Sequence, residues 1–212
     1  MDTLIIKKKQ EKPTSKVGIF SGTFDPVHGG HIAFALEALQ LAGLSSVYFL
    51  PEAVPRRKEG VTHYAHRIAM LRLALKPYKQ LRMLELADKQ FSVNKTLPKL
   101  KKRFEGKQLY LLTGSDMVEI LESDKWPGSN RLLEAVTLIV GLRSGAEVRR
   151  MRIMINKLQP AALVVEPSRP HASSRDIRRA LMSGKEHKEL LASLKTYIAL
   201  NWLYCSVVPN NS

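Results

Sequence analysis

Residues 21–31 read Ser-Gly-Thr-Phe-Asp-Pro-Val-His-Gly-Gly-His, and this stretch decides which fold the chain is expected to adopt. The apolar residues 17–20 before it are typical of a buried strand, and residues 32–39 after it have the periodicity of a helix. A strand, a glycine-bearing turn and a helix N-terminus form an anion site in an α/β sheet, because free backbone N–H groups and the positive end of the helix dipole face the ligand. His28 and His31 share one face of the first helical turn. The stretch therefore predicts a site for nucleotide phosphates.

The histidine pair has two other interpretations. Two histidines on an ordinary surface helix need no ligand, and two histidines can also be half of a zinc site, which takes four ligands. His63 and His66 are further candidates for such a site, whereas the single cysteine, Cys205, is near the C-terminal end. The position of the pair after a strand, a glycine and an Asp-Pro turn favours the phosphate site.

Length and composition indicate one globular domain. The chain has 212 residues, 44% of them hydrophobic, which is ordinary for a folded protein. No apolar run approaches the roughly 20 residues of a membrane helix. The N-terminal charge follows a short apolar patch, which is the reverse of a signal peptide. Together with the single cysteine, these features predict a cytoplasmic protein with no membrane partner.

The chain is strongly basic, with 34 Lys and Arg against 19 Asp and Glu and a net charge of +15. Such a balance suits nucleic acid, an anionic surface or a small polyanion as a partner. The cations form scattered clusters, without the aromatic-rich motif of an RNA-binding domain or the spacing of a zinc finger. We therefore expect most clusters to be solvated faces, a few to join a phosphate site, and nucleic acid not to be the partner.

Strand-like and helix-like segments alternate along the chain. Expected strands are 17–20, 47–50, 81–84, 109–113, 136–140 and 163–165, and expected helices are 31–42, 64–76, 95–104, 115–122, 146–158, 173–183 and 187–200. This alternation predicts an α/β fold, a Rossmann-like, doubly wound, mainly parallel sheet of five or six strands with helices on both faces. We expect a single domain over residues 16–204, after a basic, flexible lead-in at 1–15 and before a tail at 205–212.

Polar loops follow several of these strands, at the sheet edge where ligands bind in such folds. Residues 51–58 follow the second strand, 113–116 the fourth, 141–143 the fifth and 171–178 the sixth. Each loop alone is a weak signal, and the simplest explanation of Ser173 is a helix N-cap. Their shared location predicts one site built from all of them.

Two of these stretches resemble a known family. Residues 22–31 resemble the signature of the nucleotidyltransferases that carry a His-x-Gly-His motif, and residues 173–178 resemble their C-terminal Ser-Ser-Thr-x-Ile-Arg motif, with Arg175 in place of threonine. Within that superfamily the chain is most similar to the bacterial nicotinate-nucleotide adenylyltransferases, from about residue 17 to residue 200. The chain length and the loop at 51–58 support this, as do Arg67 with Met70 and Leu71, Gly114 with Asp116, Trp126 and Arg143.

The resemblance implies transfer of AMP from ATP to the 5′-phosphate of nicotinate mononucleotide, giving deamido-NAD and pyrophosphate in NAD biosynthesis. It implies catalytic roles for His28, His31, Lys58 and Arg178. It implies ATP binding by Gly22, Thr23, Phe24, His28, His31, Ser173, Ser174 and Arg178, and acceptor binding by Gly114, Asp116, Trp126, Arg143, Asn94 and Thr96. Mg²⁺ would be held through the substrate phosphates and not by a carboxylate cage.

Three residues have structural alternatives to a role in binding. Asp116 would accept hydrogen bonds from ribose hydroxyls, and it can also cap the helix at 115–122. Trp126 would stack on the pyridine ring or, alternatively, fill a loop against the core. Asp25 is expected to organise its turn instead of touching substrate.

The acceptor segment is where the chain departs from the family. The family's Ser-Tyr-Thr-x-x-Thr-Leu segment corresponds to residues 91–97, Phe-Ser-Val-Asn-Lys-Thr-Leu, in which Val93 replaces a hydroxyl. Backbone N–H groups, Asn94 or Lys95 can take over recognition of the nicotinate carboxylate. The alternatives are the same chemistry on nicotinamide mononucleotide or phosphopantetheine, a cytidylyltransferase, or a non-catalytic protein that binds nucleotide or RNA. The complete set of phosphate-binding residues argues against the last of these.

Overall fold

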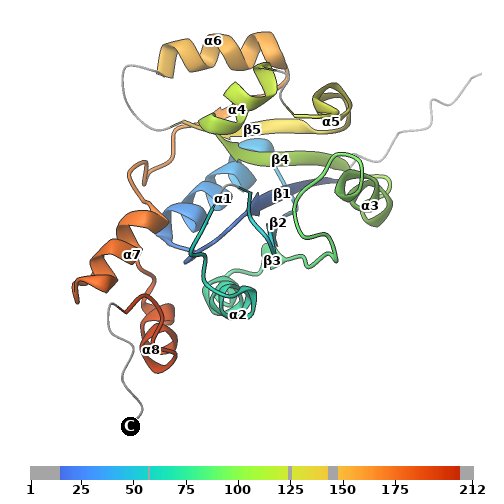
Figure 1. Ribbon diagram of the computed structural model, residues 1–212. Helices are drawn as coiled ribbons and strands as arrows, with labels where there is room; N and C mark the ends of the chain where they lie inside the picture. Colours follow the sequence, from blue (N-terminus) through green and yellow to red (C-terminus); the bar gives the residue numbers. More distant parts are fainter. Residues whose placement is uncertain (1–14, 57, 124–125, 143–147, 206–212) are drawn as a thin grey trace, which may run out of the picture.

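One parallel sheet organises the molecule, as the computed structural model shows for residues 15–56, 58–123, 126–142 and 148–205 (Figure 1). The sheet has six strands in the order β3-β2-β1-β4-β5-β6, and every neighbouring pair is parallel. The strands are β1 (Lys16–Gly22), β2 (Ser46–Pro51), β3 (Leu81–Met83), β4 (Gln108–Gly114), β5 (Thr137–Gly141) and β6 (Leu163–Val165). The predicted doubly wound α/β fold is confirmed.

Helices cover both faces of this sheet (Figure 1). They are α1 (Gly29–Ala42), α2 (Tyr64–Leu75), α3 (Thr96–Arg103), α4 (Ser115–Glu122), α5 (Ser129–Ala135), α6 (Val148–Leu158), α7 (Ser174–Met182) and α8 (Ala192–Leu200). Buried side chains of α1, α2, α7 and α8 belong to one core cluster, and those of α3 to α6 belong to the other. Strand β1 serves both clusters, because its successive residues alternate between the faces: Ile19 belongs to one and Phe20 to the other.

Two helices differ from the expectation. Helix α5 was not predicted, because seven residues are too few to show a helical period, and it begins after Gly128 in the left-handed conformation at φ 84°. Helix α8 begins at Ala192 and not at residue 187, because residues 187–191 turn back toward α1. There the carbonyl of Glu189 accepts the Gly29 N–H at 3.0 Å.

The sheet has its topological switch point between β1 and β4. From β1 the chain builds outward through β2 and β3, and it then returns to the other side of β1 to add β4, β5 and β6. The carboxyl ends of the central strands meet at one edge, where Gly22 pairs with Pro51 and Gly114 with Gly141. In open α/β sheets, ligands bind outside such an edge at the switch point. Within the described residues, no helix is both long and apolar enough to span a bilayer.

Candidate active site

A cleft of about 1080 Å³ lies at the switch point. Its walls come from the turn after β1, the loop after β2, the ends of β4 and β5, and residues 167–179 around the start of α7. The predicted residues that line it are Gly22, Thr23, Phe24, His28, His31, Lys58, Gly114, Asp116, Ser173, Ser174 and Arg178. The structure therefore brings together all the residues predicted to bind ATP, and two of those predicted to bind the acceptor.

The two histidines lie against each other at the start of α1. His28 is the N-cap residue with an extended backbone, φ −146° and ψ 173°, and its N–H donates to His31 Nδ1 at 3.3 Å. The ring centroids are 3.7 Å apart. Burial, with smaller contributions from His28 and Lys58, lowers the pKa of His31 well below its usual value of 6.5. His31 is therefore neutral near pH 7, and because Nδ1 accepts a hydrogen bond, its proton is on Nε2.

Lys58 and Arg178 extend from distant segments to residues 21–31, which we call the motif loop. Lys58 Nζ donates to the Thr23 hydroxyl at 2.8 Å. Arg178 of α7 donates to the carbonyl of Asp25 at 2.6 Å and keeps about a third of its side chain exposed. One hydrogen bond thus holds each charged group at the motif loop, and its other N–H groups can donate to a ligand in the cleft.

Close packing joins the start of α7 to the start of α1. Ser173 caps α7 by accepting an N–H from the first turn at 3.4 Å, as predicted. The Ser174 hydroxyl donates to the carbonyl of Pro26 at 2.9 Å. A Cβ added to Gly30 would lie 2.4 Å from the Cβ of Ala172, so only glycine permits this approach. The two helix N-termini consequently face one cleft, where their dipoles favour anions.

The wall made by residues 167–179 is basic. Four arginines line the cleft there: Arg169, Arg175, Arg178 and Arg179. Arg169 is held by the buried Glu189 at 2.9 Å, an arrangement that the sequence analysis missed, because the two residues are far apart in sequence and belong to no motif. This wall attracts a polyanion such as a triphosphate, and it explains part of the high net charge.

Arg67 shapes the cleft from behind. Its guanidinium is almost completely buried and donates to four main-chain carbonyls, those of Thr23, Glu52, Ala53 and Thr62, at 2.8–2.9 Å. It thereby ties the motif loop to the loop that carries Lys58. Burial lowers the pKa of Arg67, but a guanidinium remains charged near neutral pH. The family resemblance indicated Arg67 without this role, and the available signal was an arginine within a largely apolar helix.

Asp116 lines the cleft from the segment that follows β4. It is in the first turn of α4, directly after β4, and its Oδ1 would be 2.7 Å from a Cβ at Gly114. The carboxylate therefore folds over the strand end and faces the cleft that both residues line. A carboxylate in this place can accept hydrogen bonds from ribose hydroxyls.

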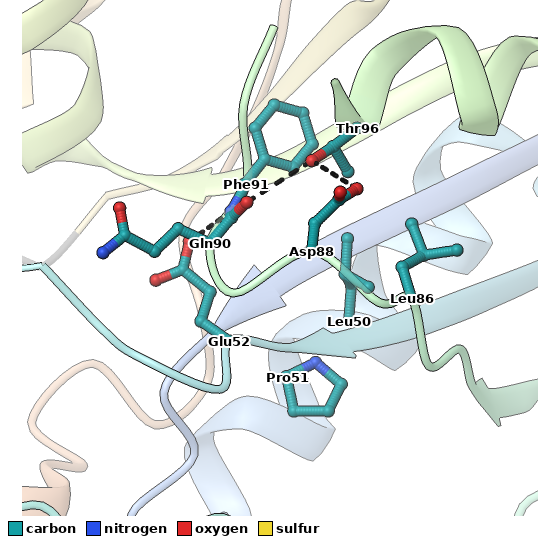
Figure 2. A pocket seen from close by; sticks show the side chains of 8 residues that line it. All are labelled: Leu50, Pro51, Glu52, Leu86, Asp88, Gln90, Phe91 and Thr96. Atoms are coloured by element: carbon teal, nitrogen blue, oxygen red, sulfur yellow. Dashed lines mark hydrogen bonds between the residues drawn. The ribbon is translucent and has the colours of Figure 1, made fainter. Parts of the chain in front are cut away.

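Thr96 does not line this cleft. It borders a separate cavity of about 10 Å³, room for a single water (Figure 2). Its hydroxyl accepts the Ser92 N–H at 3.0 Å and donates to Asp88 at 3.1 Å, and nearby Glu52 accepts the Phe91 N–H at 3.0 Å. Thr96 thus fixes the loop at 88–96 through bonds within the protein.

The other predicted acceptor residues are also engaged elsewhere. Asn94 accepts a hydrogen bond from Arg131 through its Oδ1. Trp126 is buried and packs edge-on against Phe91, with centroids 5.8 Å apart at 67°, and the Arg56 guanidinium is 5.7 Å from its ring. Neither Asn94 nor Trp126 is among the described residues that line the cleft. Arg143 lies outside the described residues.

Comparisons with known proteins agree with the geometry. Residues 19–180 match the family model described as cytidylyltransferase-like. The chain is 34% identical to the "Probable nicotinate-nucleotide adenylyltransferase" of Carboxydothermus hydrogenoformans, over 90% of this chain and 98% of the relative. It is 34% identical to the nicotinate-nucleotide adenylyltransferase of Bacillus subtilis, over 89% and 98%.

A solved structure has the same fold. It is the nicotinic acid mononucleotide adenylyltransferase of Plasmodium falciparum complexed with NaAD, with a TM-score of 0.73 and 17% identity. The match covers 90% of this chain and 97% of that one. A second structure of that protein, complexed with APC, matches with a TM-score of 0.74 over the same shares.

Proposed function

The chain belongs to the nicotinate-nucleotide adenylyltransferases, and from that premise we propose that the cleft transfers the adenylyl group of ATP to the 5′-phosphate of nicotinate mononucleotide. The products are deamido-NAD and pyrophosphate, in a step of NAD biosynthesis. The observation that carries the proposal is the convergence of two helix N-termini, two histidines, a lysine and an arginine on one cleft. The NaAD and APC bound by the Plasmodium relative are nucleotides of the kinds that this reaction requires.

The reaction asks little acid–base chemistry of the protein. An oxygen of the mononucleotide phosphate attacks the α-phosphorus of ATP. The bond between that phosphorus and the oxygen that bridges the α- and β-phosphates breaks. Pyrophosphate leaves with the electron pair. The nucleophile is already an anion, so no proton has to be removed from it. What the site must supply is position and stabilisation of the charge that develops on the transferring phosphoryl group.

That stabilisation comes from what we call the phosphate end of the cleft, which consists of the motif loop, Lys58 and the start of α7. His31, neutral and carrying its proton on Nε2, donates a hydrogen bond to a phosphate oxygen, and His28 lies beside it. Lys58 neutralises charge where the two reactants meet. Arg178, with the Ser173 and Ser174 region at the start of α7, holds the β- and γ-phosphates. The main chain of the motif loop, at Gly22, Thr23 and Phe24, cradles the same nucleotide.

Mg²⁺ enters this proposal as a partner of ATP. Among the described residues, no group of three or more His, Cys, Asp or Glu is placed to hold a metal ion. The side chains proposed to contact the phosphates are cations and hydrogen-bond donors, and none of them is a carboxylate that would bind Mg²⁺ directly. Such a donor set fits a Mg²⁺ held by phosphate oxygens and water, and when bound the ion adds charge neutralisation on the phosphates.

On the acceptor side, we propose that Asp116 and Gly114 hold the nucleotide ribose and that Thr96 acts by fixing the loop at 88–96. Backbone N–H groups of that loop then replace the family hydroxyl that Val93 lacks. Asn94 and Trp126 bind the acceptor in this proposal only after the contacts that now engage them rearrange.

Pyrophosphate release tests the proposal, with ATP, Mg²⁺ and one of three acceptors: nicotinate mononucleotide, nicotinamide mononucleotide or phosphopantetheine. We expect a strong preference for the acid mononucleotide. A preference for the amide would retain the chemistry and assign a different acceptor to the loop at 88–96. No turnover with any of the three would contradict the proposal.

A further inference from the structure

The carboxylate of Asp25 joins three parts of the chain beneath the cleft. The side chain is buried, with 3% exposure. Its Oδ2 accepts the Thr62 N–H at 3.2 Å, and its Oδ1 accepts the hydroxyl of Tyr204 at 2.6 Å. The main-chain carbonyl of the same residue accepts Arg178 at 2.6 Å. Asp25 thus links the motif loop to the loop after β2, to α7 and to the segment that follows α8.

Tyr204 reaches this place through an unusual turn of the chain. Trp202 and Tyr204 both have positive φ, 51° and 60°, a conformation that side-chain-bearing residues adopt rarely and at a cost. The turn brings the tyrosine back from the end of α8 to the motif loop. Burial, and then the Asp25 carboxylate, raise the pKa of Tyr204 well above its usual value, so the hydroxyl keeps the proton that it donates.

We propose that Tyr204 is a positioning residue for adenylyl transfer, whose hydroxyl holds the Asp25 carboxylate so that the Asp25 carbonyl can aim Arg178 at the triphosphate. This inference rests on the proposed function. Tyr204 lies outside both motifs, and in this arrangement it acts on ATP through two intermediate residues without touching it.

The charges around Asp25 show why the hydroxyl matters. Arg178 Nη1 is 3.9 Å from Asp25 Oδ2, close enough to be attracted but too far for a hydrogen bond. Without the Tyr204 hydroxyl, Oδ1 would be a buried charged oxygen that has lost its donor. Arg67 also interacts with this carboxylate but is held by four main-chain carbonyls, so Arg178 is the cation that can move toward it. That movement would take the guanidinium away from the cleft.

The structure offers a matched control at Tyr197. The hydroxyl of this α8 residue shares a hydrogen bond with His66 Nδ1 of α2 at 2.9 Å, and neither residue is among those that line the cleft. Tyr197→Phe therefore removes one comparable tyrosine hydroxyl from the same C-terminal region. Thermal melts of the two variants measure what each hydroxyl contributes to stability, and turnover then shows what is specific to Tyr204.

The test compares Tyr204→Phe, Tyr197→Phe and the unmodified protein. For Tyr204→Phe we expect kcat/KM for ATP to fall about tenfold or more, the scale of one hydrogen bond to a charged group, with KM for nicotinate mononucleotide unchanged. For Tyr197→Phe we expect unchanged kinetics and a similar melting temperature. Equal kinetic effects of the two substitutions, or a loss in Tyr204→Phe that tracks its melting temperature, would overturn the proposal.

A double-mutant cycle with Arg178→Ala separates positioning from general stability. If Tyr204 acts through Arg178, adding Tyr204→Phe to Arg178→Ala costs little more than Arg178→Ala alone. Multiplicative losses would contradict that route. Equilibrium binding of α,β-methylene ATP to the four proteins of this cycle (unmodified, Tyr204→Phe, Arg178→Ala and the double variant) gives a readout that needs no acceptor. It tests Tyr204 even if the unmodified protein turns over none of the three acceptors and the proposed function fails.

Discussion

At the phosphate end of the cleft, the predicted side chains come from three distant segments and line one space, whereas on the acceptor side only Gly114 and Asp116 line the cleft and the other described residues are bound to other parts of the protein. Lys58 and Arg178 each use one hydrogen bond to the motif loop and keep their charge toward the cleft. Thr96 and Trp126 are buried among their own neighbours. The end proposed for the ATP phosphates is therefore preassembled in this structure, while the loop at 88–96 is held by its own contacts, which engage the N–H groups of Phe91 and Ser92.

The largest expected effect comes from His31→Ala. It removes the Nε2–H donor proposed to meet a phosphate oxygen, so kcat should fall by about 10²–10³-fold, as for other single donors to a developing charge. Pyrophosphate release measures it. His63→Ala is the control, because His63 also stands at a helix start but caps α2 outside the cleft. Near-normal activity of His31→Ala would show that the phosphate end does not work as assigned.

Gly30→Ala should be next in size. The added Cβ would lie 2.4 Å from Ala172 and would push the start of α7 away from the start of α1. We expect kcat/KM for ATP to fall by about 10–100-fold, because small misplacements of positioning groups are costly.

The compensating change is Ala172→Gly, which removes the other partner of that clash. Gly30→Ala combined with Ala172→Gly should recover much of the activity. A double variant as poor as Gly30→Ala alone would mean that the separation of the two helix starts is not what limits ATP binding.

Thr96→Val probes the acceptor side and should act mainly on stability. It removes the hydroxyl bonded to Ser92 and Asp88 while keeping the shape, so the free energy of unfolding should fall by about 1–3 kcal/mol. Urea denaturation measures this. KM for ATP should stay unchanged, and KM for nicotinate mononucleotide should rise only a few-fold. A rise of a hundredfold or more without loss of stability would make Thr96 a direct ligand and remove the contrast between the two sides.

The contrast between the two sides also explains which residues of the site could be predicted from the sequence and which could not. The phosphate end depends on short motifs at strand ends, such as residues 22–31 and 173–178, and the alternation of strands and helices alone places those ends at one edge. Tyr204 and Glu189 could not be found in this way, because their partners are set by how the segments around α8 turn back. The role of Thr96 depends on the packing of one loop, which a single sequence does not encode as a pattern.

The smallest expected effect is a pH dependence of stability that belongs to the phosphate end alone. In the unfolded chain His31 takes up a proton near its ordinary pKa of about 6.5, whereas burial lowers the pKa of the folded ring well below that value. Between the two pKa values the unfolded state binds more protons, so the free energy of unfolding rises with pH in that window and is lost as pH falls below about 6.5. Urea denaturation at pH 7.5 and 5.5 should show about 1 kcal/mol more acid destabilisation in the unmodified protein than in His31→Gln. The comparison cancels the other histidines, which both proteins share. Equal losses would mean that the folded ring takes up its proton as readily as the unfolded one, and the neutral Nε2–H donor proposed for ATP would lose its physical basis.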